Sequence, residues 1–281
     1  MTVLPRRGGA VLGAPIAHSL SPVLHKAAYD VLGLSDWNYT AVECAEADLE
    51  ATLQRLDADG LAGVSLTMPL KRAVLPMLAR SERLVDDVGA ANTVMFGGVP
   101  GEWWGGNTDV GGLVAALRHA DVDAPRRVCV LGAGATAAST LAALRDLGAS
   151  AAVVIVRRPG ATADLVAAAT RLGMAVDVLP WADAAGVVAA SDLVVSTTPA
   201  GATDELATAL TPRDDAVLFD VVYSPWPTAF AEAWGRAGGR VVGGLELLVE
   251  QAALQVTLMT GREAPVDAMR EAGVAALGVS G

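Results

Sequence analysis

The chain has 281 residues, of which 53% are hydrophobic, 18% are charged and 4% are aromatic, and its formal net charge is −11. This length is enough for one large domain or two ordinary ones. The acidic balance argues against a nucleic-acid partner, and two cysteines are too few for a disulfide framework. We find no metal-ligand spacing and no apolar run long enough to span a membrane, so we expect a cytoplasmic protein without a metal.

Strands and helices alternate through the first hundred residues. The pattern predicts, in chain order, a strand at 9–13, a helix at 22–32, a strand at 38–42, a helix at 47–57 and a strand at 61–66. It then predicts an irregular or weakly helical stretch at 81–91 and a hairpin of residues 92–96 and 102–106. Because strands that alternate with helices form parallel sheets, we expect ligands outside the carboxyl ends of the strands.

Two serines in the loop after the first strand each have two interpretations. Ser21 directly precedes Pro22 and can cap the following helix, which would give it a structural role. Ser19 has no such role in the pattern. The two hydroxyls can equally hold a small anionic ligand.

The loop after the third strand contains Thr67 and Lys71. Pro69 suits the first position of a helix, so Lys71 is expected in a first turn, where the helix dipole disfavours a cation. A lysine placed against this rule is either a solvated surface residue or a functional one. Asp109 likewise has two interpretations: it can cap the helix expected at 110–119, or it can act in a site.

Residues 128–139 read VCVLGAGATAAS and combine a buried strand, a glycine turn and a helix start. Gly132 permits the tight turn, and Gly134 allows the backbone to approach a pyrophosphate at the helix N-terminus. The next strand, 151–156, is followed by Arg157 and Arg158, where an NAD-binding protein usually has an acidic residue. Paired arginines match the 2′-phosphate of NADP, so we expect NADP rather than NAD.

Further alternating elements complete a second α/β domain. Strands are expected at 175–179, 192–196, 216–221 and 240–242, and helices at 135–147, 164–172, 183–190 and 228–237. Two last helices follow, at 245–259 and 266–277. Gln251 lies within the first of these, where it either makes a polar contact between helices or faces a ligand.

The last two helices suggest that the chain returns to its first domain. That domain would then be discontinuous, with residues 1–109 plus 244–281, around a dinucleotide-binding domain of residues 110–243. The expected fold is α/β with two α/β domains: a substrate domain whose mainly parallel sheet is completed by the C-terminal helices, and a Rossmann-like NADP-binding domain. A cleft between the two domains is the expected active site.

Five groups of motifs together resemble the shikimate dehydrogenase family over nearly the whole chain. They are Ser19-Leu-Ser21-Pro22, Ser65-Leu-Thr67-Met-Pro69-Leu-Lys71, Ala91-Asn92-Thr93 with Asn107-Thr108-Asp109, Asp220-Val-Val-Tyr223-Ser-Pro225, and Leu248-Val-Glu-Gln251-Ala252. The chain has Ser65 where the family usually has Asn, and Glu246 where Met is common. The resemblance implies reversible reduction of 3-dehydroshikimate to shikimate with NADPH, in the biosynthesis of aromatic amino acids.

The resemblance also implies a role for each matching residue. Lys71 and Asp109 would form the catalytic pair at the reacting oxygen, because a group with protons to give stabilises and protonates a developing oxyanion. The substrate carboxylate would be bound by Ser19 and Ser21, and the ring and its hydroxyls by Thr67, Asn92, Tyr223 and Gln251. The expected cofactor contacts are Gly132, Ala133, Gly134, Ala135, Arg157, Arg158, Thr197, Thr198, Val221 and Gly244.

Two alternatives remain at this point. One is a quinate/shikimate or aminoshikimate-type dehydrogenase of the same superfamily, although Arg157 and Arg158 argue against the NAD that quinate enzymes often prefer. The other is a non-catalytic NADP-sensing homologue, which is expected to lose the Lys71 and Asp109 pair that this chain retains. The expected partner is a small-molecule substrate, with no nucleic acid and no membrane, and the expected assembly is a monomer or a homodimer.

Overall fold

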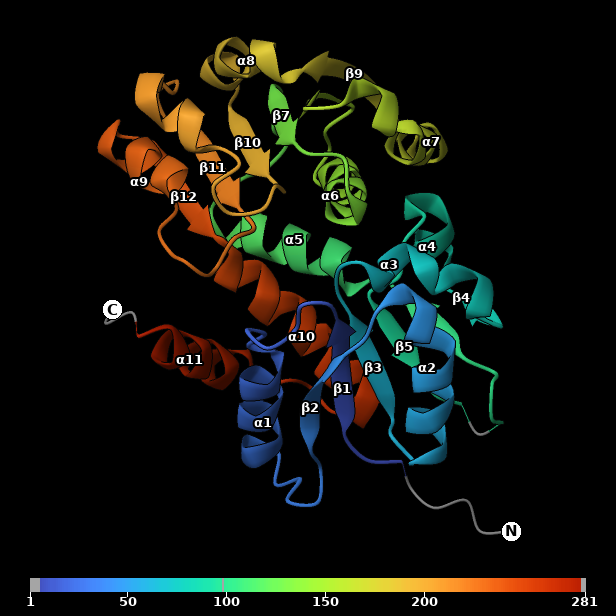
Figure 1. The fold of residues 1–281 in the computed structure, drawn as a ribbon. Coiled ribbons are helices and arrows are strands. Elements are labelled where there is room, and N and C mark those ends of the chain that lie inside the picture. The colour runs from blue at the N-terminus through green and yellow to red at the C-terminus, as the bar shows by residue number, and fades with distance from the viewer. Residues whose placement is uncertain (1–5, 98, 279–281) are drawn as a thin grey trace. The chain divides into compact units, whose positions relative to one another are not determined.

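The computed structural model describes residues 6–97 and 99–278, and the chain divides into two compact units. Unit 1 contains Met1–Thr108 and Leu248–Gly281, and unit 2 contains Asp109–Leu247. Figure 1 shows the chain coloured from the N-terminus to the C-terminus, with the last two helices in red. The first unit is therefore assembled from both ends of the chain.

Unit 1 forms, among the described residues, a six-stranded sheet in the order β2-β1-β3-β5-β6-β4. The three strands β1, β2 and β3 run parallel, and β5 is antiparallel to both β3 and β6. The strands are β1 (Gly9–Gly13), β2 (Tyr39–Glu43), β3 (Gly63–Leu66), β4 (Arg80–Ser81), β5 (Thr93–Met95) and β6 (Trp104–Gly106). The helices are α1 (Ser21–Val31), α2 (Leu49–Ala58), α3 (Leu70–Ala73), α4 (Arg83–Val88), α10 (Gly244–Thr260), which belongs to unit 1 from Leu248 onward, and α11 (Val266–Leu277), with short 3₁₀ turns at Glu46–Asp48 and Leu75–Met77.

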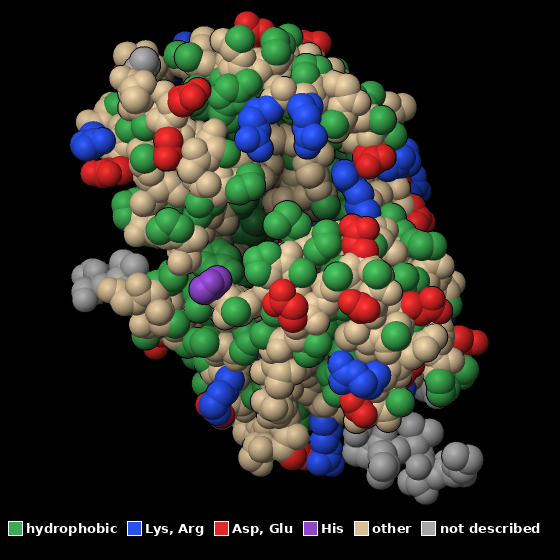
Figure 2. Space-filling view, in the orientation of Figure 1, with side chains coloured by type: hydrophobic (Ala, Val, Ile, Leu, Met, Phe, Trp, Pro, Cys, Tyr) green, Lys and Arg blue, Asp and Glu red, His purple; other side chains and the backbone are tan. Residues whose placement is uncertain are grey.

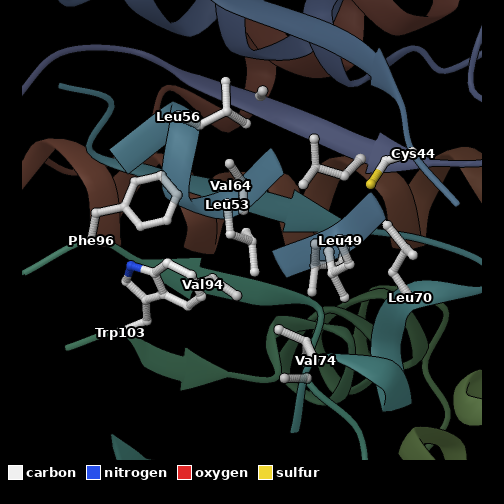
Figure 3. Packing of buried hydrophobic residues seen from close by; sticks show 14 of the residues in the cluster. Cys44, Leu49, Leu53, Leu56, Val64, Leu70, Val74, Val94, Phe96 and Trp103 are labelled. Carbon is white, nitrogen blue, oxygen red and sulfur yellow. The ribbon is translucent and has the colours of Figure 1, made fainter. Parts of the chain in front are cut away.

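The two faces of this sheet are covered by different helices. Strand β1 is buried throughout, and its alternate residues point to opposite faces. Ala10 and Leu12 belong to a core with Leu53 of α2, whereas Val11 packs with residues of α1 and α10 such as Tyr29 and Met259. Figure 3 shows the α2 side of this core, in which Leu49, Leu53 and Leu56 come from α2 and pack near Val64, Val94, Phe96 and Trp103.

Asp57, at the end of α2, is a buried carboxylate that joins three parts of unit 1. Its two oxygens accept hydrogen bonds from Arg6 Nη2 at 2.5 Å, Trp103 Nε1 at 2.8 Å and the Gly101 amide at 3.1 Å. The side chain of Asp57 is only 3% exposed. Burial alone would raise the pKa of Asp57, but the hydrogen bonds from Trp103, Gly101 and Arg6 and the charge of Arg6 lower it overall.

Unit 2 is a six-stranded parallel sheet, in the order β12-β11-β10-β7-β8-β9. When β7 is taken as the first strand, this is the strand order of doubly wound dinucleotide-binding domains. The order in which successive strands are added to the sheet reverses between β7 and β10. The strands are β7 (Val128–Leu131), β8 (Ala151–Val156), β9 (Ala175–Pro180), β10 (Leu193–Ser196), β11 (Val217–Asp220) and β12 (Arg240–Gly243). The helices are α5 (Thr108–His119), α6 (Ala135–Asp146), α7 (Ala163–Leu172), α8 (Ala184–Ala190) and α9 (Ala229–Arg236), with 3₁₀ turns at Pro159–Ala161, Trp181–Asp183 and Asp204–Ala209.

The predicted α/β class, the hairpin and the strands of both sheets are confirmed, with ends that differ by up to two residues. Strand β4 was not predicted. It lies at the start of the stretch interpreted as irregular or weakly helical, in which the short helix α4 forms. Both are shorter than the window over which a periodic pattern can be recognised.

Acidic and basic side chains are interspersed on the face of the molecule that Figure 2 shows. Some exposed side chains of the described residues form ion pairs one helical turn apart, such as Lys26 with Asp30 at 3.1 Å and Arg236 with Glu232 at 3.3 Å. Exposed pairs of this kind contribute only a few tenths of a kcal/mol each, about 0.3–0.5. Within the described residues, no helix has the length and apolar character needed to cross a membrane.

Candidate active site

The loop after β1 carries Ser19 and Ser21 to the start of α1. The structure corrects the interpretation of Ser21 as the helix cap, because Leu20 occupies the cap position and Ser21 is the first helical residue. Ser19 takes the local role instead, since its hydroxyl accepts a hydrogen bond from the Ser21 amide at 3.3 Å. A shift of one residue at a helix end is enough to exchange these two roles. The hydroxyl of Ser21 is therefore not used to cap α1.

His25, one turn after Ser21, was not singled out from the sequence. Its Nδ1 lies 2.9 Å from the Ser21 carbonyl oxygen, which can only accept, so Nδ1 carries the proton and donates. The ring is fully buried and stacks on Tyr39 with centroids 3.7 Å apart. Burial lowers the pKa of His25 to about 4, against the opposing effect of the Ser21 hydrogen bond, so the ring is neutral at physiological pH.

The loop after β3 brings Thr67 and Lys71 to the same edge of the sheet. β1 and β3 are parallel neighbours, and Leu12 is paired with Leu66 at their carboxyl ends. The Thr67 amide donates to the Leu12 carbonyl at 2.9 Å, and Ala14 donates to the Met68 carbonyl at 3.1 Å. The two loops that follow these strands are thus bonded to each other.

Lys71 lies in α3, which has only four residues. Its carbonyl oxygen accepts a hydrogen bond from the Ala91 amide at 2.8 Å, and this bond holds α3 against the residue that precedes Asn92. The side chain of Lys71 is partly exposed. The bond therefore holds the backbone of Lys71 beside Ala91, the neighbour of Asn92 in the sequence.

Asn92 is the centre of a buried hydrogen-bond network. Its Nδ2 donates to Thr108 Oγ1 at 2.9 Å and to Gln251 Oε1 at 3.3 Å. Its Oδ1 accepts from the Thr108 amide at 2.8 Å and from Thr93 Oγ1 at 2.9 Å. The network joins two expected substrate contacts, Asn92 and Gln251, that lie 159 residues apart in the sequence.

Thr108 was not proposed as a site residue, although it is the middle residue of the Asn107-Thr108-Asp109 motif. Both its amide and its hydroxyl bond to Asn92, at 2.8 Å and 3.2 Å. Asp109 follows directly and lies in the first turn of α5 rather than capping it, since α5 begins at Thr108. Asp109 is 4% exposed, so its carboxyl group is buried next in sequence to this network.

The glycine turn of unit 2 has the conformation that the sequence predicts. Gly132 has a φ of +107°, and a Cβ there would lie 2.6 Å from Thr197 Oγ1. Thr197 Oγ1 donates to the Leu131 carbonyl at 2.8 Å, which joins the ends of β7 and β10. Gly134 is exposed at the N-terminus of α6, and a Cβ there would meet no atom within 4 Å. Between Ala133 and Ala135, Gly134 therefore leaves open space at the N-terminus of α6, which fits a dinucleotide pyrophosphate.

Arg157 and Arg158 follow β8, the strand next to β7. Both side chains are exposed. This is the place in the fold where the adenosine ribose of a dinucleotide is recognised, and a guanidinium there matches a 2′-phosphate. The residues present therefore fit NADP.

The remaining expected cofactor contacts lie at the carboxyl ends of β10, β11 and β12. Thr198 Oγ1 lies 3.3 Å from Ser196 Oγ, at the end of β10. The Val221 amide donates to the Ser196 carbonyl at 3.0 Å, and the Gly244 amide donates to the Val222 carbonyl at 3.2 Å. A Cβ on Gly244 would lie 2.0 Å from the Val221 carbonyl oxygen, so only glycine fits. Tyr223, an expected substrate contact, lies half-buried in the loop after β11.

The structure thus brings the expected residues together in two sets. In unit 1, Ser19, Ser21, Thr67, Lys71, Asn92 and Gln251 gather at the carboxyl edge of β1 and β3. In unit 2, the expected cofactor contacts and Tyr223 follow the carboxyl ends of the parallel strands. No cluster of three or more metal-ligating side chains occurs in the described part of either unit.

Two α/β units, one with the strand order and glycine turn of a dinucleotide-binding domain, define a nucleotide-dependent oxidoreductase class. Two family models match the chain: the shikimate dehydrogenase substrate binding domain over residues 11–94, and the shikimate 5′-dehydrogenase C-terminal domain over residues 244–272. The chain is 36% identical over 279 residues to shikimate dehydrogenase (NADP⁺) of Moorella thermoacetica, covering 96% of this chain and 94% of that one. The chain belongs to the shikimate dehydrogenase family.

Solved structures agree with this assignment. The shikimate dehydrogenase of Mycobacterium tuberculosis is 40% identical, with a TM-score of 0.85 over 95% of this chain and 99% of that one. The enzyme of Thermus thermophilus, in complex with NADP(H) and shikimate, is 32% identical, with a TM-score of 0.83 over 96% of this chain and all (100%) of that one. The resemblance predicted from the motifs is confirmed.

Proposed function

We propose that this protein catalyses the reversible NADPH-dependent reduction of 3-dehydroshikimate to shikimate, a step in the biosynthesis of aromatic amino acids. The observation that carries the proposal is the convergence of five of the six expected substrate residues, all but Tyr223, at one sheet edge of unit 1, centred on the Asn92 network. Relatives of similar length named as NADP-dependent shikimate dehydrogenases support the same activity. The acid–base pair Lys71 and Asp109 favours an enzyme over a cofactor sensor.

Substrate recognition is assigned to hydroxyl and amide groups. The hydroxyls of Ser19 and Ser21 bind the carboxylate, next to the start of α1, whose dipole favours an anion. The ring hydroxyls are bound by Thr67, Asn92, Tyr223 and Gln251. Both N–H groups and both lone pairs of the Asn92 amide are bonded within the protein, so Asn92 binds a ring hydroxyl by exchanging one of these bonds, of which the 3.3 Å bond to Gln251 is the longest.

Bound NADPH supplies the hydride for this reaction. Lys71 donates a hydrogen bond to the substrate oxygen, where it stabilises the negative charge that develops and delivers the proton. Asp109 orients Lys71 and accepts a hydrogen bond from the substrate hydroxyl in the reverse direction. The pair therefore moves one proton between protein and substrate oxygen.

The cofactor contacts divide into a phosphate end and a nicotinamide end. Residues 132–135 bind the pyrophosphate at α6, and Arg157 with Arg158 binds the 2′-phosphate. Thr197, Thr198, Val221 and Gly244 hold the remaining part. Residues 1–109 plus 244–281 form the substrate domain and residues 110–243 the dinucleotide domain, a division close to that of the two compact units. The enzyme acts in the cytoplasm as a monomer or a homodimer.

Purified protein is expected to reduce NADP⁺ with shikimate at least about tenfold more efficiently than NAD⁺, because only NADP⁺ carries the phosphate that the arginines match. The measurement is kcat/KM for each cofactor at saturating shikimate, repeated with quinate in place of shikimate. A preference for quinate would make the protein a quinate-type dehydrogenase, and NADP⁺ binding without turnover would favour the sensor.

Replacing both Arg157 and Arg158 by alanine is expected to raise the KM for NADP⁺ by about 100-fold, roughly tenfold for each lost charged hydrogen bond. The KM for NAD⁺ should change by less than about twofold, since NAD⁺ has no phosphate there. Arg126→Ala is the matched control, because Arg126 is an exposed arginine that precedes β7. It therefore lies near the amino end of that strand, whereas Arg157 and Arg158 follow the carboxyl end of β8. Equal losses for both cofactors would contradict the assignment of the arginines.

A further inference from the structure

Asp220 is a buried carboxylate that the proposed reaction does not use. It is the last residue of β11 and is 1% exposed. Its Oδ1 accepts a hydrogen bond from the Val222 amide at 3.2 Å, and its Oδ2 accepts one from Thr228 Oγ1 at 2.8 Å. Burial raises the pKa of Asp220, against the opposing effect of hydrogen bonds from Thr228, Val222 and Ser196. Because burying a carboxylate costs free energy, we expect Asp220 to have a role beyond packing.

The hydrogen bonds from Val222 and Thr228 to Asp220 close both ends of one loop. Val222 is two residues after Asp220, and Thr228 caps helix α9, where its hydroxyl also accepts from the Ala231 amide at 3.1 Å. The loop between them contains Tyr223. The carboxylate therefore fixes where this loop leaves the sheet and where it enters the next helix.

Asp220 also lies between the strand ends that carry the expected cofactor contacts. It is paired in register with Ser196 of β10 on one side and Gly243 of β12 on the other. The next residue along each strand is an expected cofactor contact: Thr197, Val221 and Gly244. The Val221 amide bonds to the Ser196 carbonyl, and the Gly244 amide bonds to the Val222 carbonyl, so a displacement of residues 221–222 reaches both neighbours.

We propose that Asp220 is a positioning residue that sets the Val221–Tyr223 segment, and through it both the cofactor contact of Val221 and the substrate contact of Tyr223. This inference rests on the proposed function. An aspartate is needed because both of its oxygens accept, whereas an asparagine offers one acceptor oxygen. In either orientation of an asparagine amide one bond is lost: Nδ2 would face the Val222 N–H, or it would face Thr228 Oγ1 and leave that hydroxyl proton without its acceptor.

The test uses Asp220→Asn, with binding measured by calorimetry and turnover measured separately. The dissociation constant for NADP⁺ and the KM for shikimate are each expected to rise about tenfold, as for a lost hydrogen bond to a charged group. Adenosine 2′,5′-bisphosphate, which carries only the adenosine end of the cofactor, should bind to the variant within about twofold of wild type. This probe separates a local displacement from a general loss of structure.

Thr228 provides a second pair of variants in case Asp220→Asn folds poorly. Thr228→Ser keeps the hydroxyl and should behave as wild type, whereas Thr228→Ala should weaken NADP⁺ and shikimate but not the bisphosphate. If NADP⁺ and the bisphosphate weaken equally, or if none of these constants moves, Asp220 is not a positioning residue. Wild-type protein that fails to bind NADP⁺ would overturn the proposed function as well, so the two failures are distinguishable.

Discussion

Replacing Lys71 by methionine is expected to lower kcat for shikimate oxidation by about 10³-fold, within the range of 10² to 10⁴ that a positioned acid–base group contributes. Methionine keeps the length and apolar stem of lysine but has no charge and no proton to donate. The KM for shikimate should change by only a few-fold, because binding is assigned mainly to Ser19, Ser21 and the Asn92 network. Steady-state kinetics with saturating NADP⁺ measure both constants.

The chain offers a matched control for this experiment, since its only other lysine is Lys26. Lys26 is exposed on α1 and pairs with Asp30 at 3.1 Å. Lys26→Met should leave kcat and KM within about twofold of wild type, as expected of an exposed pair of small energetic value. A Lys71→Met enzyme with turnover within a few-fold of wild type would show that another group supplies the proton.

Replacing Asp57 by alanine is expected to lower the free energy of unfolding by about 3–5 kcal/mol, the usual cost of removing one partner of a buried charged pair. The variant leaves Trp103 Nε1 and the Gly101 amide without their acceptor and removes the carboxylate that pairs with Arg6. Urea denaturation followed by tryptophan fluorescence measures this change, because Trp103 itself lies at the site.

The control for Asp57 is Asp36→Ala, which removes an exposed carboxylate paired with Arg7. It should change the free energy of unfolding by less than about 1 kcal/mol. Similar losses of unfolding free energy for the two variants would mean that the buried pair of Asp57 and Arg6 stabilises the fold no more than an exposed pair does.

The Asp57 effect should also depend on pH in a defined direction. The pKa of Asp57 is lowered in the folded protein from the ordinary aspartate value of 3.8, so its contribution is fully present above that value. The contribution is lost as the pH falls through the folded-state pKa. The difference in unfolding free energy between wild type and Asp57→Ala should therefore be constant from about pH 5 to 8 and shrink below about pH 4.

Much of the fold could be predicted because its strands are continuous apolar runs. β7 and β10 are buried along their whole length, and such runs bounded by turn residues are characteristic of parallel sheets. Strand β4 could not be predicted, because two residues carry no period. The exchange of roles between Ser19 and Ser21 depends on one residue at a helix end, which local propensity does not resolve.

The candidate site was predicted as a set of residues but not as a network. Motif resemblance selected Asn92 and Gln251, yet the bond between them depends on how α10 packs on the sheet. For a related reason His25 was not singled out, and Asp220 was named only as part of a motif, without a role. Their importance comes from what they touch, Ser21 in one case and residues 222 and 228 in the other, and no sequence period records a hydrogen bond. Burial of a titratable group becomes visible only in three dimensions.

The return of the chain to unit 1 has a consequence for its synthesis on the ribosome. Met259 packs with Val11 and Tyr29, and Gln251 bonds to Asn92, so the first hundred residues lack part of their core until the last forty are made. Unit 2 is continuous and needs no later segment. Unit 2 can therefore complete its fold before unit 1 does, although unit 1 begins first in the sequence. Until α10 has been synthesised, one apolar face of the unit 1 sheet lacks the helix that covers it.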